Sequence, residues 1–464
     1  MMVNFVKLWF QTSNSIKINI FPWRKKPDQI IRPLVRYSFF ALKYLIIRIN
    51  YQPWQYQRKQ IPITYTSLRP AIIIATHSLI CTIMWIAKIQ WPNLVFPLTY
   101  DDSARIFHLS CFTMLIKFMI VINCILEFMW FILFRKVLSY NSGFNELLIH
   151  YYIYENDLYM LPRYRRYLYR LIIISDYLSL QSLLIFSLAI TYWLIRIIYE
   201  LFSLFYAYQI SFIVLIYSIH VTIIEYLHCL YLISLFAIPL KALIIVVEYL
   251  IVQFKQIVLT TKQLFDYRFN HRIPVIIKMR MNWNDFYGNY IRIFDHTAKF
   301  NHDLKIVLLA METVSKASII FSTIFYSQKV TETIPGAIFV ICLFSFFCLS
   351  TGVYSRFSNF PSFNHRCYQH LLSWTIRISK LQSKINANRR KKRLRDLIIF
   401  SRRDLIKINL FLQTMKRNRL GFTCGKIFFI NKFQYVELVL MNIPLTIMFY
   451  KKICLNLNYK IDNN

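Results

Sequence analysis

The chain has 464 residues, of which 57% are hydrophobic and only 17% are charged, so it carries more apolar surface than one soluble core could bury. Its formal net charge is +35, but the excess Lys and Arg lie in blocks between apolar runs, where anionic lipid headgroups and the positive-inside rule account for them. Composition therefore indicates a polytopic membrane protein with membrane lipids around it, and argues against nucleic acid as a partner.

Residues 1–70 form a basic segment at the start of the chain. Lys7, Asn14 and Lys17 interrupt its first part, so it lacks the continuous apolar core of a secretory signal peptide. We expect a cytoplasmic N-terminal segment, with membrane insertion directed by an internal helix.

Long apolar runs follow and predict membrane-spanning helices. A long apolar region also lies between Ser203 and Phe254, and hydropathy does not decide whether 171–254 holds two long helices or three short ones. The other runs start near Ala71, Cys111, Leu171, Val307, Gly336 and Phe433.

The basic residues between the runs predict the orientation, because cytoplasmic loops carry most of the Lys and Arg. The segments 135–170 and 255–304 are both rich in Lys and Arg, so both lie inside. Two spans, near 171–197 and 229–254, therefore separate them, and 203–227 becomes an outer loop or a helix extension. The prediction is an all-α membrane protein with seven transmembrane helices, a cytoplasmic N-terminus and an extracellular C-terminus. The counts run twelve in 1–70, one in 93–110, six in 135–170, eight in 255–304, one in 328–335 and eighteen in 355–426.

Known motifs give no support to an enzyme or to a cofactor. The sequence contains no GxSxG, Walker, GxGxxG or HExxH pattern. Its nine cysteines show no CxxC spacing, so we expect neither a disulfide framework nor a cysteine-based metal site. The nearest approach to a metal-ligand set is His365, Cys367 and His370, which we interpret as a solvated loop.

Charged residues inside the apolar runs predict pairing between helices, because an unpaired charge at membrane depth is costly. Lys117 and Glu127 lie in the second run, and Lys241 and Glu248 lie in the fourth.

Four aromatic residues lie near the outer end of the third run. They could line a pocket for a small-molecule ligand, and an interfacial aromatic belt would contain the same residues. They are Tyr192, Trp193, Tyr199 and Tyr206.

Residues 356–426 predict a cytoplasmic anchor made of two amphipathic helices. Apolar residues recur at alternating steps of three and four, which places one apolar stripe on each helix. The stripes could pack within one subunit or between subunits. Their members are Leu371, Trp374, Ile378, Leu381 and Ile385, and then Leu394, Ile398, Ser401, Leu405, Ile408, Leu412 and Met415.

The stretch NRLGFTCGKIFFINKF, residues 418–433, holds two of the six glycines, Gly421 and Gly425. Glycine tolerates positive φ and close approach, so these residues would let the chain leave the cytoplasmic helix and re-enter the membrane tightly. In this part of the chain a long amphipathic helix is followed by a Gly-containing break, a phenylalanine pair and an Asn before a final helix. This order resembles the C-terminal signature of arthropod gustatory receptors, T-A-G-G-L-F-P-V-D. The residues that align with it without a gap are Thr423, Gly425, Ile427, Phe428, Ile430 and Asn431.

This resemblance implies a ligand-gated nonselective cation channel in the plasma membrane. Four subunits, identical or related, would surround a pore lined by the seventh helix. Residues 71–355 would hold the first six helices and a pocket for a small-molecule tastant, 356–426 the anchor, and 427–464 the pore helix and an extracellular tail. Where the family has a Thr-Tyr pair and a later Gln, this chain has Pro444, Leu445 and Lys451, which puts normal gating and selectivity in doubt. The alternatives are a seven-helix receptor that signals through cytoplasmic partners and a membrane scaffold protein.

The last apolar run carries polar residues over about half of its circumference at 100° per residue. Polar groups at membrane depth must meet water or a partner, so this face either lines a pore or forms hydrogen bonds to other helices. The pore-lining candidates are Gln434, Glu437, Asn442, Thr446, Met448 and Lys451.

Overall fold

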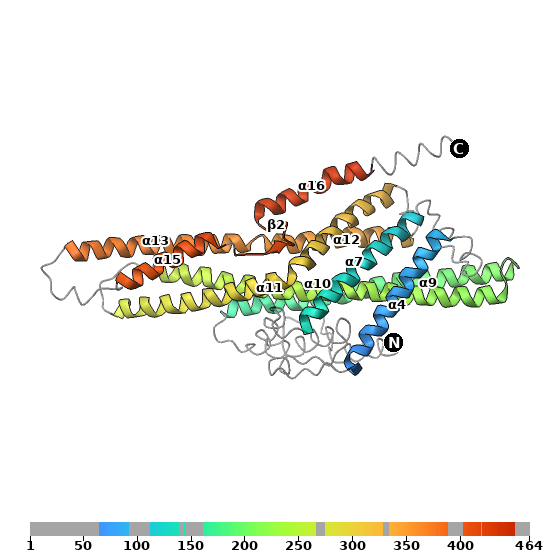
Figure 1. Ribbon diagram of the computed structural model, residues 1–464, viewed down its shortest axis with the longest axis horizontal. Coiled ribbons are helices and arrows are strands. Elements are labelled where there is room, and N and C mark those ends of the chain that lie inside the picture. Colours follow the sequence, from blue (N-terminus) through green and yellow to red (C-terminus); the bar gives the residue numbers. More distant parts are fainter. Residues whose placement is uncertain are drawn as a thin grey trace.

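The structure is a computed structural model that describes residues 65–91, 112–138, 143, 161–265, 274–327, 334–387, 402–418 and 420–450. Long helices run mostly along one axis of the molecule, and two two-residue strands interrupt them near the C-terminal end (Figure 1). The residues at 394, 398, 401 and 451 that the sequence singled out lie outside the described residues. The helices are α4 (Tyr65–Gln90), α7 (Phe112–Leu138), α9 (Pro162–Tyr206), α10 (Phe212–Phe265), α11 (Pro274–Ser327), α12 (Ile334–Phe357), α13 (Phe360–Ala387), α15 (Arg402–Arg417) and α16 (Lys432–Tyr450).

Helices α9 and α10 form a long antiparallel pair joined by the tight turn 207–211. Tyr208 takes a positive φ of 56° in this turn, and the Ser211 side chain accepts a hydrogen bond from Val214 N at 3.4 Å, which caps the start of α10. Of the two alternatives for 203–227, the helix extension is therefore correct. With 54 residues, α10 is about 80 Å long at 1.5 Å per residue, far longer than a bilayer is thick.

Helix α11 is also longer than the apolar run that predicted it. It begins at Pro274, where a proline fits the first helical turn, and continues without a break to Ser327, although the apolar run starts only near Val307. Polar residues between these points belong to the helix and not to a loop.

The α12–α13 junction is a short break at Ser358 and Asn359. The Ser358 hydroxyl and the Asn359 side-chain amide both donate hydrogen bonds to Ser355 O, at 2.8 and 3.0 Å. Helix α13 then continues along the bundle and carries the first of the two apolar stripes (Figure 1).

The apolar stripes of α13 and α15 are buried in one core with α10 and α11. The Trp374 ring stacks on that of Trp283 in α11, with centroids 6.0 Å apart and an interplanar angle of 14°. The described members of the stripes therefore pack within a single chain and not between subunits. The buried members are Leu371, Trp374, Ile378, Ile408, Leu412 and Met415.

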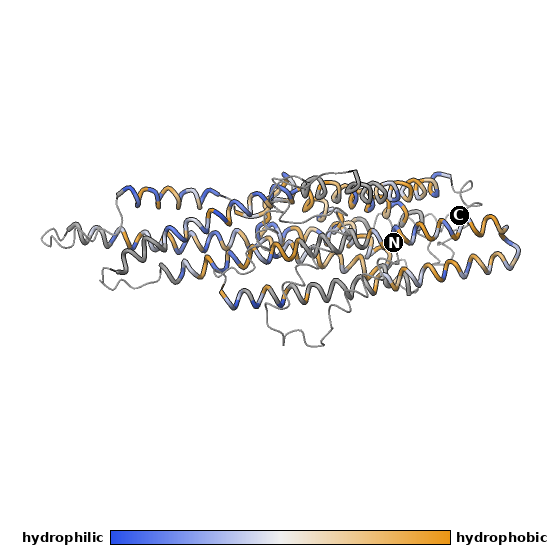
Figure 2. Tube along the Cα trace, turned by 90° about the horizontal axis from the view of Figure 1, so that it is seen from below, coloured by the Kyte–Doolittle hydropathy of each residue, from blue (hydrophilic) through white to orange (hydrophobic). Residues whose placement is uncertain are grey.

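Apolar residues concentrate in the half of the molecule that contains the α9–α10 turn, whereas the end formed by α13 and α15 is more hydrophilic (Figure 2). Among the described residues, four helical stretches are long and apolar enough to cross a membrane. Two of them belong to the single helix α10. The prediction of seven spans and their orientation stays a prediction. The four stretches are Ile185–Tyr206, Phe212–Leu232, Leu243–Lys262 and Val340–Lys380.

Candidate functional site

The link between α15 and α16 is a small β-hairpin. Strands β1 (Thr423–Cys424) and β2 (Phe428–Phe429) pair antiparallel, with Thr423 opposite Phe429 and Cys424 opposite Phe428. Asn431 then caps α16, because its Oδ1 accepts a hydrogen bond from Gln434 N at 2.8 Å. The segment that resembles the receptor signature thus ends one helix, turns, and starts the next.

Both glycines of this hairpin have positive φ, 153° for Gly421 and 59° for Gly425, as the sequence predicted. A Cβ on Gly421 would lie 2.7 Å from Cζ of Phe429, and one on Gly425 would lie 3.1 Å from Cδ2 of Leu309 in α11. Both positions therefore need glycine for conformation, and Gly421 needs it for space as well.

The hairpin is bound to α11 through its backbone. Gly425 N donates to Lys305 O at 2.6 Å, and Asn301 Oδ1 accepts from Thr423 N at 2.8 Å. These contacts link the segment just before α16 to α11.

Buried aromatic residues hold the hairpin against α12 and the α12–α13 junction. The Phe422 ring is fully buried, and its centroid lies 4.3 Å from that of Phe357 and 5.0 Å from that of Phe360. The Tyr354 hydroxyl donates to Leu308 O and lies 3.7 Å from Sγ of Cys424. Burial raises the pKa of the Cys424 thiol to about 11.

Helix α16 packs against α11 and α12 by one side and is uncovered on the other (Figure 1). Asn442, one of the pore-lining candidates, is buried on the packed side, and its Oδ1 makes no hydrogen bond. Gln434 and Thr446 are half-buried, whereas Glu437 and Met448 are exposed. The polar candidates are thus divided between two faces. The uncovered face is otherwise apolar and includes Phe433, Val436, Leu440, Met441, Ile443 and Ile447.

Three of the four aromatic pocket candidates lie on the outside of the α9–α10 pair. The exposed fractions are 45% for Tyr192, 72% for Tyr199 and 75% for Tyr206, whereas Trp193 packs beside the buried cluster at the turn. This exposure fits the interfacial belt better than a pocket within one chain. A role in ligand binding stays a prediction.

A polar cluster lies between α4, α7 and α10. Oε1 of Glu225 in α10 accepts hydrogen bonds from Lys88 Nζ at 2.8 Å and from Trp85 Nε1 at 3.2 Å. One turn further along α10, His228 Nε2 lies 3.2 Å from Oδ1 of Asn123 in α7. These buried contacts join three helices that are far apart in the sequence.

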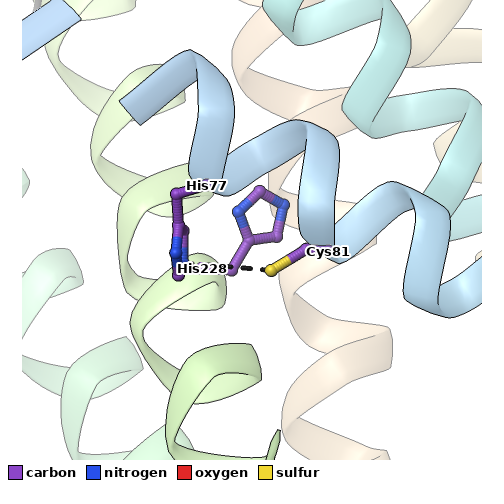
Figure 3. Close-up of side chains that lie close together, drawn as sticks. All are labelled: His77, Cys81 and His228. Carbon is purple, nitrogen blue, oxygen red and sulfur yellow. Dashed lines mark hydrogen bonds between the residues drawn. The ribbon is translucent and has the colours of Figure 1, made fainter. Parts of the chain in front are cut away.

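His77, Cys81 and His228 converge in the same cluster (Figure 3). One nitrogen of each imidazole and Sγ of Cys81 all lie within 4.8 Å of one another. The sequence analysis missed this group, because its members occupy two helices. The available signal was the four-residue spacing of His77 and Cys81, which places both on one face of a helix.

The three neighbouring residues His365, Cys367 and His370, which the sequence analysis interpreted as a solvated loop, lie instead in a helix. His365 and Cys367 belong to helix α13 and not to a solvated loop, and their two-residue separation places them on different faces. Cys367 is fully buried, whereas His365 is exposed and contacts Gln369.

The charges predicted to pair between helices behave differently from one another. Glu248 is buried and pairs with Arg356 of α12, which confirms cross-helix pairing for this residue. Lys117 is exposed, and Oε1 of Glu127 is buried without a hydrogen-bond partner.

Comparison with protein-family models gives no match, and comparison with curated proteins gives none either. Among the solved structures that resemble the chain are two of an insect olfactory receptor. The insect olfactory receptor OR5 from Machilis hrabei in complex with eugenol matches 90% of this chain and 98% of its own, at 10% identity and a TM-score of 0.56. A second structure of the same receptor matches at 13% identity and a TM-score of 0.48, over 90% of this chain and 97% of its own. The first likeness shows that this chain has the same helical fold.

Proposed function

We propose that the chain is a chemoreceptor subunit of the gustatory-receptor type, a nonselective cation channel opened by a small molecule. The observation that carries the proposal is the fold, because the likeness extends over 90% of this chain and nearly all of the olfactory receptor that was solved with eugenol. The receptor-like linker before the last helix supports the same proposal independently.

The hairpin between α15 and α16 gives a physical route for gating. Helix α16 begins at a segment held by α11 through Asn301 and Lys305, and by α12 through packing around Phe422. A ligand that binds more tightly to one arrangement of the helices than to another would shift the population of α16 positions.

The uncovered face of α16 supports assembly into an oligomer. Its apolar residues are at least half exposed in a single chain, with Phe433 at 73% and Ile447 at 61%. In a tetramer of identical or related subunits in the plasma membrane, four such helices would surround one pore, with residues 356–426 as the anchor.

Imaging the purified protein in lipid nanodiscs tests this assembly. We expect fourfold particles with α16 next to the central axis, and small organic molecules should evoke cation currents from the same preparation in planar bilayers. Monomeric particles without evoked current would contradict the channel. An extracellular N-terminal tag on intact cells would favour the receptor that signals through cytoplasmic partners.

A further inference from the structure

We propose that His77, Cys81 and His228 form a three-coordinate site for monovalent copper between α4 and α10 (Figure 3). His77 Nε2 lies 3.9 Å from Cys81 Sγ, and one nitrogen of His228 completes a group whose members lie within 4.8 Å of one another. Bonds of about 2.0–2.3 Å place the three ligand atoms of a planar site about 3.6 Å apart. Side-chain rotations that move these atoms by about 1 Å are enough to close the site.

Hydrogen bonds leave one nitrogen of His228 ready to bind. Thr82 donates its hydroxyl proton to Ser78 O at 2.8 Å, so Thr82 Oγ1 accepts from the Asn123 amide at 2.7 Å. That orientation makes Asn123 Oδ1 an acceptor, so His228 donates to it from Nε2 at 3.2 Å. The Nδ1 atom of His228 then carries a lone pair, and it is buried without a hydrogen-bond partner. Hydrogen bonding of one ring nitrogen while the other binds is the usual arrangement of a metal-ligating histidine.

The three side chains lie at a largely closed site, and the polar groups Glu225, Lys88 and Asn123 beside them are already hydrogen-bonded. Cys81 and His228 are fully buried, and the Trp85 ring packs edge-on against His228 with centroids 5.4 Å apart. His77 is only half-buried, so an ion has a side from which to enter. The nearby acid Glu225 is already paired with Lys88, so the three ligands are one thiol and two imidazoles.

Charge selects the ion. On binding, the Cys81 thiol loses its proton to solvent and forms a metal–sulfur bond, while both imidazoles stay neutral. A monovalent ion with one thiolate gives a neutral centre, whereas a divalent ion would leave one uncompensated positive charge at a buried site, because the carboxylate of Glu225 is already paired with Lys88, and such a charge is costly. Thiolate and imidazole are also the ligands that suit monovalent copper.

Copper titration of the purified full chain tests this site. We expect the protein in nanodiscs, under anaerobic reducing conditions, to take one equivalent of Cu(I) from a chromophoric chelator, and X-ray absorption to show two nitrogen neighbours and one sulfur. His77→Ala, Cys81→Ser and His228→Gln should each lose that equivalent. Asn123→Ala keeps the three ligands and should weaken binding by about 10- to 100-fold.

Exposed residues of the same types provide the controls. Cys124→Ser in α7 and His220→Ala in α10 should bind copper as the wild type does. Circular dichroism and size-exclusion chromatography identify variants that fold. His77→Ala changes a half-buried position, so it still tests the site if Cys81→Ser and His228→Gln do not fold. Equal copper uptake by wild type and His77→Ala would overturn the site. Tighter binding of Zn²⁺ than of Cu(I) at these residues would overturn the assignment to copper.

Discussion

Glu248 of α10 and Arg356 of α12 form an ion pair across the bundle, with Oε1 and Nε 2.9 Å apart. The carboxylate side chain is only 3% exposed, and the Tyr167 hydroxyl donates to its other oxygen at 3.0 Å. Removal of the guanidinium would leave a buried charge with one hydrogen bond, which is less favourable than a complete pair.

Arg356→Met should therefore lower the free energy of unfolding by about 2 kcal/mol, less than for a fully buried pair because water screens the 49%-exposed guanidinium. Thermal unfolding in detergent, followed by tryptophan fluorescence, measures the loss. Arg356→Met combined with Glu248→Gln should recover part of it, because the buried charge is then gone. No difference between wild type and Arg356→Met would contradict the pairing.

The buried stripe of α15 gives a prediction that separates packing within one chain from packing between subunits. Ile408 is fully buried within its own chain, so Ile408→Asp should prevent the single chain from folding and should not simply dissociate an oligomer. Leu410→Asp is the matched control, because Leu410 is 56% exposed on the same helix.

Fluorescence-detected size-exclusion chromatography separates these two outcomes. Ile408→Asp should give aggregate or no folded protein. Leu410→Asp should fold, and it should give smaller particles if the outer face of α15 lies between subunits. Folded tetramers of Ile408→Asp would show that the stripe is not part of the core.

Local patterns in the sequence predicted the elements that local forces determine. The stripe through Trp374 and Ile378, and the positive φ of Gly421 and Gly425, follow from helical periodicity and from glycine's lack of a Cβ. Hydropathy could not place the α9–α10 turn, because apolar residues continue on both sides of 207–211. In α11 it identified only the apolar part of a longer helix.

The sequence could not predict which distant segments of the chain come into contact. His77 and Cys81 meet His228 only because α4 packs against α10, and Glu248 meets Arg356 only because α10 reaches α12. A single sequence predicted that Glu248 pairs with another helix, but it contains no signal for which residues meet. The group that it did single out, His365, Cys367 and His370, consists of neighbours in the chain, and the sequence analysis interpreted it as a solvated loop.

The hairpin glycines should differ in their tolerance of a side chain. Gly425→Ala should cost about 1 kcal/mol for its positive φ, whereas Gly421→Ala should cost more, because its Cβ would also clash with Phe429. Gly352→Ala is the control, since a Cβ there meets nothing within 4 Å and alanine favours the helix. Melting temperatures of the three variants rank the costs, and equal values for Gly421→Ala and Gly352→Ala would contradict the hairpin geometry.

The Cys424 thiol should resist alkylation in the folded protein. Burial raises its pKa to about 11, so at pH 8 only about one thiol in a thousand is the reactive thiolate. Because the pKa is raised on folding, this group's contribution to stability is complete below about pH 9 and is lost as the pH rises toward 11.

Mass spectrometry after iodoacetamide treatment measures this protection. The Cys424 peptide should stay unmodified at pH 8 until denaturant is added. The same peptide labelled in denaturant provides the comparison. Equal labelling of Cys424 in the folded and in the denatured protein would show that the hairpin does not bury the thiol.

The two faces of α16 should contribute to different properties of the proposed channel. Glu437 lies on the uncovered face, where four copies around a pore would attract cations, so Glu437→Gln should lower cation permeability relative to anions. Asn442 is on the packed face, so Asn442→Leu should change stability or gating and leave the permeability ratio unaltered.

Lys451, which follows the last residue of this helix in the sequence, should act in the opposite direction to Glu437. Four ammonium groups about 8 Å apart would repel one another by roughly 0.5 kcal/mol per pair even at a dielectric constant near that of water, and would repel an entering cation in the same way. Lys451→Gln should then increase the cation current, provided that the side chains face the pore and do not extend into the headgroups.

Reversal potentials under ionic gradients, in a preparation with ligand-evoked current, measure the effects of both Glu437→Gln and Lys451→Gln. Identical permeability ratios in wild type, Glu437→Gln and Lys451→Gln would exclude both residues as determinants of selectivity, and a ratio altered by Asn442→Leu alone would place the pore on the other face of α16.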